Sequence, residues 1–135
     1  MTTLTIRTES REEFVDITAQ VLAAVREAAI REGVCFVWTL HTTCGVTVNE
    51  SADPDVGRDL AARLALLAPR DADYRHDDGN ADAHVKTALV GTSVSLPVAD
   101  GALLLGTWQG VFLAEFDGPR ARRVAVRVLA IDGAR

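Results

Sequence analysis

The sequence predicts an α+β domain built like a β-sandwich, with mixed or antiparallel sheets and two or three flanking helices. Helical apolar spacing is confined to the first two thirds of the chain, whereas the last third consists of β-favouring runs separated by turn residues. The 135 residues match the usual size of one domain, and no linker composition interrupts them. We therefore expect a single domain spanning residues 1–135.

The first third of the chain predicts a strand, a helix and a second strand. Leu4 and Ile6 alternate with polar neighbours, which is typical of a short strand with one solvated face. From about residue 13 to residue 32, apolar residues recur every three or four positions, so we expect an amphipathic helix that ends at Gly33. The stretch 34–40 is apolar on both parities and β-favouring, which predicts a central strand covered on both faces.

The middle of the chain predicts one more strand and two helices. Val46 and Val48 alternate with polar residues and indicate a strand. Asp53 and Pro54 then supply an N-cap and a first-turn proline for a helix that runs towards Leu67. After a polar, turn-rich loop from 71 to 80, a short helix over 81–90 is closed by Gly91 and carries His84.

The last third predicts a β-meander, which brings the expected total to seven or eight strands. Its strands and turns are 92–98, a turn at Asp100-Gly101, 102–116 with a break near Gly106 or Gly110, a turn at Asp117-Gly118-Pro119, and 122–131.

Charge and composition exclude several classes of function. The net charge is −5 and the pI is about 5.1, so a phosphate backbone would be repelled and we expect no nucleic-acid partner. The N-terminus resembles neither a signal nor a transit peptide, and no apolar run approaches the length of a membrane span. We therefore expect a cytoplasmic protein without a membrane segment, in which Cys35 and Cys44 are reduced thiols.

The first candidate site is the segment 41–50, HTTCGVTVNE, at the end of the predicted central strand. Counted by twos, His41, Thr43, Thr47 and Asn49 share a parity and form one polar face if no bulge intervenes. The alternative is a hydrogen-bonded histidine at a strand end, followed by a turn that caps the next helix.

The second candidate site is the polar loop before the helix over 81–90, which holds His76, Asp77, Asp78 and Asn80 and leads to His84. Imidazoles suit zinc and other transition metals, whereas paired aspartates suit magnesium, so the residues are compatible with either kind of ion. The alternative is a solvated acidic loop, because the eight-residue separation of the histidines matches no recognised zinc motif.

The third candidate is a carboxylate in the last hairpin. Glu115 lies between apolar residues of both parities, so it is expected to be buried and to need a cationic partner. Arg122 shares the parity of the apolar residues in the next strand and should point inward, whereas Arg123 and Arg127 should be solvated. Glu115 with Arg120 or Arg122 then forms either a structural ion pair or part of an anion-binding wall.

Three further residues have two interpretations each. Trp108 and Gln109 offer an aromatic surface and an amide near that hairpin, or simply pack in the core. Cys44 follows His41 by three residues, but nothing else in the sequence fixes the geometry of a catalytic pair, so we interpret it as a small buried apolar residue.

Four sequence blocks follow one another in the order HTTCGVTVNE, YRHDDGN with a later His, GALLLGTWQG and EFDGPRARR. The order of these blocks resembles the YjbQ family, which is labelled secondary thiamine-phosphate synthase. The resemblance runs from about residue 34 to residue 128, and the first strand and helix also fit. It implies an α+β fold and a homotrimer whose polar pockets lie at or near subunit contacts. It also implies a weak transferase activity that joins a pyrimidine pyrophosphate to a thiazole phosphate and releases pyrophosphate.

The resemblance further implies roles for individual residues. The positions that match the family motif include His41, Asn49, Glu50, Gln109 and Glu115, which we predict to be catalytic, and Arg120 and Arg122, which we predict to bind substrate. To the substrate-binding group we add Thr43, from the polar parity of its segment, and Trp108, whose ring is suited to stack on a heterocycle. A divalent metal ion, zinc or magnesium, is expected on His41, His76 and His84, with Glu50 as a further ligand or as a base. Relatives often carry serine or alanine at the position of Cys44, and the short loop 74–84 leaves the roles of Asp77, Asp78 and Asn80 open.

Two other functions fit the same residues, so the sequence leaves open whether the protein is an enzyme. One is a metal-dependent hydrolase, or another transferase, that acts on a small phosphorylated metabolite. The other is a trimer that binds a small ligand without turning it over.

Overall fold

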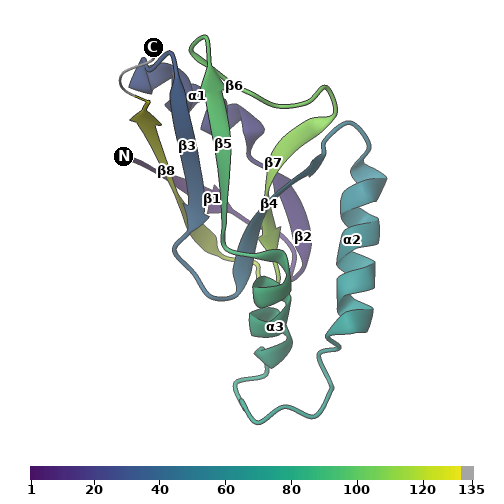
Figure 1. Ribbon diagram of the computed structural model, residues 1–135. Helices are drawn as coiled ribbons and strands as arrows, with labels where there is room; N and C mark the ends of the chain where they lie inside the picture. Colours follow the sequence, from purple (N-terminus) through teal and green to yellow (C-terminus); the bar gives the residue numbers. More distant parts are fainter. Residues whose placement is uncertain (132–135) are drawn as a thin grey trace.

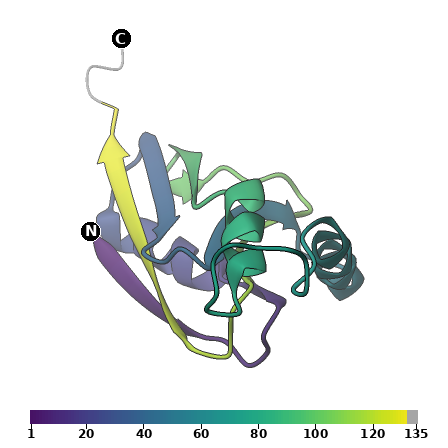
Figure 2. The same cartoon turned by 90° about the horizontal axis from the view of Figure 1, so that it is seen from below.

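The computed structural model describes residues 1–131, which form one α+β unit of eight strands and three helices, as the sequence predicts (Figures 1 and 2). The predicted domain range also includes residues 132–135, which lie outside the described residues. In chain order the elements are β1 (Thr2–Arg7), β2 (Glu13–Asp16), α1 (Thr18–Ala28), β3 (Gly33–Thr39), β4 (Cys44–Glu50), α2 (Pro54–Leu67), α3 (Ala81–Val90), β5 (Ser93–Ala99), β6 (Ala102–Leu103), β7 (Gln109–Glu115) and β8 (Ala121–Ala130).

The strands form two antiparallel sheets, one with the order β1-β8-β3-β5-β6 and one with the order β2-β7-β4. The predicted C-terminal meander is therefore wrong, because β7 lies in a different sheet from β5 and β8. Turn residues specify where a chain reverses, but they do not specify which strand it pairs with next. Here the loop after β6 lets the chain cross to β4 and β2 before it returns as β8.

The main core lies between the two sheets and is closed by α1. Val21 and Val25 of α1 are buried with Val37 of β3 and with Val111 and Leu113 of β7. The central position of β3, between β8 and β5, agrees with the sequence prediction.

The prediction that β3 is covered on both faces is wrong for the single chain. Its residues alternate, so that Cys35 and Val37 are buried against the core whereas Phe36, on the outer face, is 38% exposed. An apolar run does not reveal whether its second face is covered by the same chain.

The predicted helix over residues 13–32 is also partly wrong. Residues Glu13–Asp16 form β2 instead, where they pair with Phe112–Glu115 of β7, and the helix begins only at Thr18. The side chain of Asp16 accepts a hydrogen bond of 2.9 Å from the backbone N–H of Thr18 and so marks the change of direction. The helix ends at Ala28, and Gly33 already belongs to β3.

The helices α2 and α3 are confirmed over the predicted ranges, and the Asp53 side chain caps α2 by accepting from the N–H of Asp55 at 2.9 Å. The helix α3 packs on the outer face of the three-stranded sheet, where Ala83 meets Phe116. Gly45 of β4 permits this approach, because a Cβ atom at that position would lie 2.6 Å from the carbonyl oxygen of Gly91. No residue of α2 is buried, and this helix stands beside β2 at the edge of the molecule (Figure 1).

The inner side of α3 is anchored by a buried cluster of charges. Lys86, which is 1% exposed, donates to Asp82 at 2.8 Å and also contacts Glu12. Arg11 donates to both carboxylate oxygens of Asp82, at 3.2 and 3.1 Å. Two cations and two carboxylates thus balance each other between α3 and the segment that joins β1 to β2.

Within residues 1–131, no helix is long and apolar enough to cross a membrane.

Replacing Lys86 with methionine is expected to lower the free energy of unfolding by about 3 kcal/mol, because the buried Asp82 and the partly exposed Glu12 would then share only the cation of Arg11. The measurement is urea unfolding at pH 7. The matched control is Arg58→Ala, which breaks the exposed pair with Asp55 and should change stability by less than about 1 kcal/mol. Equal effects of the two substitutions would contradict an anchoring role for the cluster.

Candidate functional site

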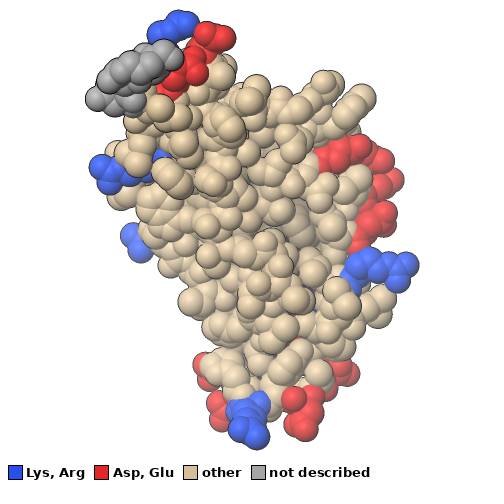
Figure 3. Space-filling model, viewed as in Figure 1, with Lys and Arg blue, Asp and Glu red and all other residues tan. Residues whose placement is uncertain are grey.

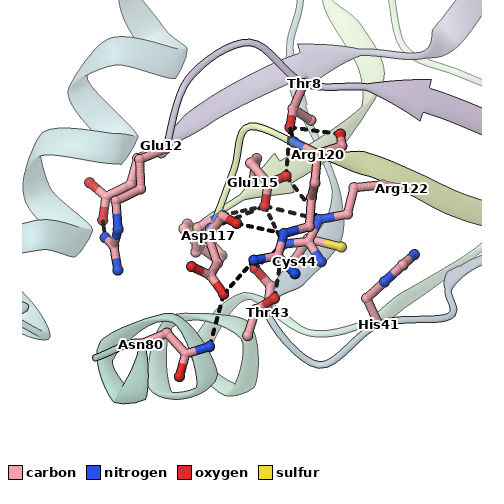
Figure 4. Close-up of polar contacts among 12 residues, drawn as sticks. Thr8, Glu12, His41, Thr43, Cys44, Asn80, Glu115, Asp117, Arg120 and Arg122 are labelled. Atoms are coloured by element: carbon pink, nitrogen blue, oxygen red, sulfur yellow. Dashed lines mark hydrogen bonds and ion pairs between the residues drawn. The ribbon is translucent and has the colours of Figure 1, made fainter. Parts of the chain in front are cut away.

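The candidate site lies where the ends of β3, β4, β7 and β8 meet the start of α3, and its centre is the ion pair of Glu115 and Arg122 (Figure 4). Glu115 is 0% exposed and Arg122 is 1% exposed. Nε of Arg122 donates to the two carboxylate oxygens at 2.8 and 3.1 Å, and Nη2 contacts the same carboxylate. Nη2 also donates to the carbonyl oxygen and the hydroxyl of Thr43, at 3.1 and 2.9 Å. The predicted inward direction of Arg122 is confirmed.

Strand alternation explains why these two charges meet inside the protein. Glu115 points to the same side of β7 as the buried Val111 and Leu113, and Arg122 points to the same side of β8 as the buried Val124. Burial by itself would raise the pKa of the Glu115 carboxyl, but hydrogen bonds from Arg122 and Thr8 hold that pKa below its usual range. The pair is therefore charged at neutral pH.

One nitrogen of this guanidinium, Nη1, is left without a protein partner in the part of the chain that the structure describes, and Arg122 lines a pocket. Among residues 1–131, Nη1 of Arg122 has no hydrogen-bond partner, although Nε and Nη2 are fully used. The pocket has a volume of about 390 Å³, and we call it the anion pocket. Its lining residues are Leu40, His41, Thr42, Thr43, Asn80, His84, Asp117, Arg120 and Arg122.

His41 lies on one side of the anion pocket as a neutral imidazole. Its Nε2 accepts a hydrogen bond of 2.8 Å from the backbone N–H of Arg123, so the ring carries its proton on Nδ1. Partial burial, together with the nearby charges of Arg122 and Arg123, lowers the pKa of His41. The ring is therefore available as a hydrogen-bond donor.

Arg120 and Asn80 are fixed by one carboxylate on the other side of the pocket. Arg120 donates from Nε to the carbonyl oxygen of Asp117 at 2.8 Å and from Nη2 to its carboxylate at 3.1 Å. Asn80 donates to the same carboxylate at 2.8 Å. Of the two arginines that the sequence offers to Glu115, Arg122 is thus the partner, and Arg120 remains half exposed at the mouth of the pocket.

A second pocket adjoins the first and shares His84 with it. This pocket, which we call the ring pocket, has a volume of about 390 Å³ and is lined by Tyr74, Arg75, His76, Ala81, His84 and Val85. The rings of His76 and His84 stand edge to face with centroids 5.1 Å apart. The loop and the helix α3 therefore bring two of the three histidines into contact, and the anion pocket brings His84 and His41 to one cavity.

The surroundings of these histidines do not suit a metal ion within one chain. Among residues 1–131, no group of three histidine, cysteine or carboxylate side chains is placed to hold a metal ion. His41 already uses Nε2 for Arg123, and Nε2 of His76 lies 3.1 Å from the side-chain oxygen of Asn80. The carboxylate of Asp78 lies 3.5 Å from Nε2 of His76, but both side chains are exposed, and the carboxylates of Glu115 and Asp117 are engaged by arginines. The arginine N–H groups that have no partner among the described residues suit an anion instead.

Four other predicted site residues lie at the opposite end of the three-stranded sheet. Asn49 and Glu50 end β4 and pair with the start of β7 at Gly110 and Gln109, whereas Cys44, at the other end of β4, pairs with Glu115. Six residues of strand separate these ends by about 20 Å. Trp108 is 65% exposed beside them, so it does not pack in the core.

The expected polar face on one strand does not form. The strand β4 begins only at Cys44, so His41 and Thr43 lie before it, whereas Thr47 and Asn49 lie on it. Thr43 instead holds Arg122.

Both cysteines are free and buried, as expected for reduced structural thiols. Burial raises the pKa of Cys35 to about 11 and also raises the pKa of Cys44, whose Sγ lies 3.0 Å from the hydroxyl of Thr39. Protonated thiols at neutral pH are poor nucleophiles, so Cys44 is best understood as a packing residue.

A larger cavity of about 550 Å³ lies between α2 and β2, next to Phe14 and Gly57. Its charged residues Glu12, Glu13 and Arg58 are all engaged elsewhere, by Lys86 and Arg11, by backbone N–H groups and by Asp55. We therefore assign the chemistry to the smaller anion pocket.

Sequence reasoning missed two residues that build this pocket. The sequence pattern around Asp117 indicates only a turn, and Thr8 lies just after the first strand in no recognisable motif. Asn80 was noted only as a potential ligand of a metal ion. The hydrogen bonds of Thr8 and Asp117 join segments more than a hundred and more than thirty residues apart, which no local pattern reveals.

Comparisons with known proteins agree with the fold. A family model described as UPF0047 protein YjbQ-like matches residues 2–131. The UPF0047 protein of Methanocaldococcus jannaschii is 46% identical over 92% of this chain and 90% of its own length. The UPF0047 protein YugU of Bacillus subtilis is 43% identical over 94% of this chain and 97% of its own length.

Solved structures give the same result. A YjbQ/UPF0047 family protein of Clostridium acetobutylicum, described as uncharacterized, superposes with a TM-score of 0.94 at 43% identity over 96% of this chain and 100% of its own. A conserved hypothetical protein of Thermus thermophilus superposes with a TM-score of 0.88 at 48% identity, again over 96% of this chain and 100% of its own.

The stability of the protein is expected to fall as the pH drops below about 4.5, the ordinary pKa of a glutamate, because Glu115 has a lowered pKa in the folded state. A group of this kind contributes stability above its unfolded pKa and loses it as the pH falls through its folded pKa. Urea unfolding between pH 7 and pH 3 measures the effect. Glu115→Gln should be less stable at pH 7 and should lose less on acidification, whereas the exposed control Glu9→Gln should behave like the wild type. Parallel pH profiles for all three proteins would contradict this assignment.

Proposed function

The chain belongs to the UPF0047 family of YjbQ-like proteins, and on this premise we propose that it binds a small phosphorylated metabolite in the anion pocket and acts on it as a transferase of the thiamine-phosphate synthase type. One observation carries the proposal. The guanidinium of Arg122 is buried, its Nη1 has no hydrogen-bond partner among the described residues, and Arg122 lines the same pocket as Arg120, His41 and His84. This is the chemistry that a phosphate or pyrophosphate group requires.

Each polar group of the pocket has a role in holding the anion. Nη1 of Arg122 donates from the floor, and its direction is fixed because Glu115 and Thr43 hold the rest of the guanidinium. Nη1 of Arg120, which has no partner among the described residues, donates from the rim. The Nδ1–H of His41 adds a neutral donor. Rigid, partly desolvated donors bind phosphate oxygens more strongly than mobile surface lysines do.

The ring pocket supports a ligand in which a flat heterocycle is joined to the phosphates. Its polar groups are few, and the edge-to-face rings of His76 and His84 form an aromatic wall next to the anion pocket. A pyrimidine pyrophosphate has both parts in this arrangement. In the transfer, the bond from the pyrimidine-bearing carbon to the pyrophosphate oxygen breaks, the electron pair leaves with pyrophosphate, and the thiazole phosphate forms the new bond to that carbon. Arg120 and Arg122 would stabilise the charge that grows on the leaving pyrophosphate.

The divalent metal ion expected on His41, His76 and His84, zinc or magnesium, is a separate proposal. Since one chain offers no set of three ligands in the part that the structure describes, such an ion would need a ligand from a neighbouring subunit or from the substrate's phosphates. A bound metal would supply further positive charge beside the pyrophosphate. The arginines carry the proposal without it.

We propose that the protein works as a homotrimer, and the charge distribution supports a contact between copies. In Figure 3 the face formed by β3, β5 and α3 shows no charged side chains, and lysine, arginine, aspartate and glutamate gather at its edges. Phe36, Leu89 and Leu129 are exposed apolar residues of these elements and of the neighbouring β8. An uncharged surface with exposed apolar residues is typical of a protein contact. In such a trimer, a neighbouring copy would bring its own residues from the far end of its three-stranded sheet to the substrate, namely Asn49, Glu50, Trp108 and Gln109.

Replacing Arg120 with alanine is expected to weaken the binding of inorganic pyrophosphate about tenfold, because one charge-assisted hydrogen bond is lost. Isothermal titration calorimetry measures the affinity, with Arg58→Ala as the control, since Arg58 is also an exposed arginine paired with an aspartate but lies on α2. The same titration in EDTA should give the same affinity. Loss of binding in EDTA that zinc or magnesium restores would instead support the metal site on the three histidines.

Replacing His84 with alanine is expected to abolish product formation from a pyrimidine pyrophosphate and a thiazole phosphate, because His84 joins the two pockets. Release of phosphate without the thiazole would indicate a hydrolase. Binding of the pyrophosphate ester without any turnover by the wild type would indicate a ligand-binding protein and would contradict the transferase.

A further inference from the structure

We propose that Thr8 is a positioning residue of the anion pocket, whose single hydroxyl group sets the directions of both pocket arginines. The inference rests on the proposed function for the nature of the ligand, and it adds a residue that no motif of the sequence indicated. Thr8 lies just beyond β1, is 6% exposed and touches the ion pair from the side opposite Thr43 (Figure 4).

The hydroxyl of Thr8 connects the two arginines through hydrogen bonds. It donates to Oε1 of Glu115 at 2.7 Å, with the carbonyl oxygen of Arg120 as a longer second acceptor at 3.1 Å, and it accepts from the backbone N–H of Arg120 at 3.0 Å. The backbone N–H of Thr8 also donates to the carbonyl oxygen of Arg120 at 3.0 Å. Because a hydroxyl has one proton, its donation to the carboxylate leaves its lone pairs for the Arg120 N–H.

The bond to Glu115 determines where Arg122 points. Oε1 of Glu115 receives both the Thr8 hydroxyl and Nε of Arg122, and Oε2 receives the N–H groups of Phe116 and Asp117. The carboxylate is therefore held from both sides, and the guanidinium that forms hydrogen bonds with it has one orientation. Without the hydroxyl, Oε1 keeps only its bond from Arg122, so the carboxylate is held less firmly and the position of Nη1 of Arg122 is less well defined.

The bond to Arg120 fixes the start of the other arginine. With its N–H and carbonyl both held by Thr8, the Arg120 backbone cannot shift, so its side chain reaches the pocket mouth from a fixed point. Gly118 makes room for this arrangement, because a Cβ atom there would lie 2.7 Å from the Thr8 hydroxyl and 2.9 Å from Cγ of Glu115. The packing thus brings backbone, hydroxyl and carboxylate together in a space that admits no further side chain.

The test compares Thr8→Val, which keeps the shape but removes the hydroxyl, with Thr8→Ser, which keeps the hydroxyl. Affinity for inorganic pyrophosphate is expected to fall about tenfold in Thr8→Val and to stay within about twofold of the wild type in Thr8→Ser. Thr5→Val, at an exposed position of β1, is the matched control and should bind as the wild type does. In an Arg120→Ala background, Thr8→Val should weaken binding by less than in the wild type, because the two changes act through one group.

A second readout needs no ligand. The Nε–H signal of Arg122 in a nitrogen-15 NMR spectrum should exchange slowly in the wild type and in Thr8→Ser, and should shift and exchange faster in Thr8→Val. If the wild type binds pyrophosphate and Thr8→Val binds it equally well, the inference is overturned while the proposed function stands. If the wild type does not bind pyrophosphate, the proposed function fails, and an unchanged Arg122 signal in Thr8→Val would then overturn the inference as well.

Discussion

The buried ion pair between Glu115 and Arg122 is the constraint on which the candidate site depends. Two charges between packed sheets are tolerated only when hydrogen bonds replace the lost water, and here Thr8, Thr43 and backbone N–H groups do so. Both oxygens of the Glu115 carboxylate accept hydrogen bonds, whereas Nη1 of the Arg122 guanidinium has no partner among the described residues. The structural ion pair that the sequence predicted is therefore present, and under the proposed function the same arginine would also form the anion-binding wall that the sequence offered as the alternative.

The position of α3 turns this ion pair into a cavity. The charge cluster around Lys86 holds the inner side of the helix, while Asn80 and His84, on the side away from that cluster, reach the pocket and its neighbour. The helix thus has two polar sides, one in the charge cluster and one that lines the pocket. The uncharged sheet face beside it, which is exposed in the single chain, is consistent with further copies of the protein that cover it (Figure 3).

Much of the fold followed from local patterns, and the site followed in part. Alternation along β7 and β8 correctly predicted that Glu115 and Arg122 point inward, and the capping residues Asp53 and Gly91 correctly bounded α2 and α3. The strand order was not predictable in this way, because β7 pairs with β4 and with β2, whose residues lie 59 or more positions away in the sequence. The same pairing places Gln109 beside Glu50, at the far end of β4 from His41, although Glu50 and His41 belong to one sequence motif. The hydrogen bonds of Thr8 are also long-range, so no local pattern points to this residue.

The most direct test of this account is a crystal structure of the protein with pyrophosphate bound. The account predicts a phosphate oxygen at about 3 Å from Nη1 of Arg122, with Arg120 and His41 as further donors and with the Glu115 ion pair unchanged. Pyrophosphate bound beside α2, or an Arg122 whose Nη1 points away from a filled pocket, would contradict the claim that the buried ion pair builds the anion site.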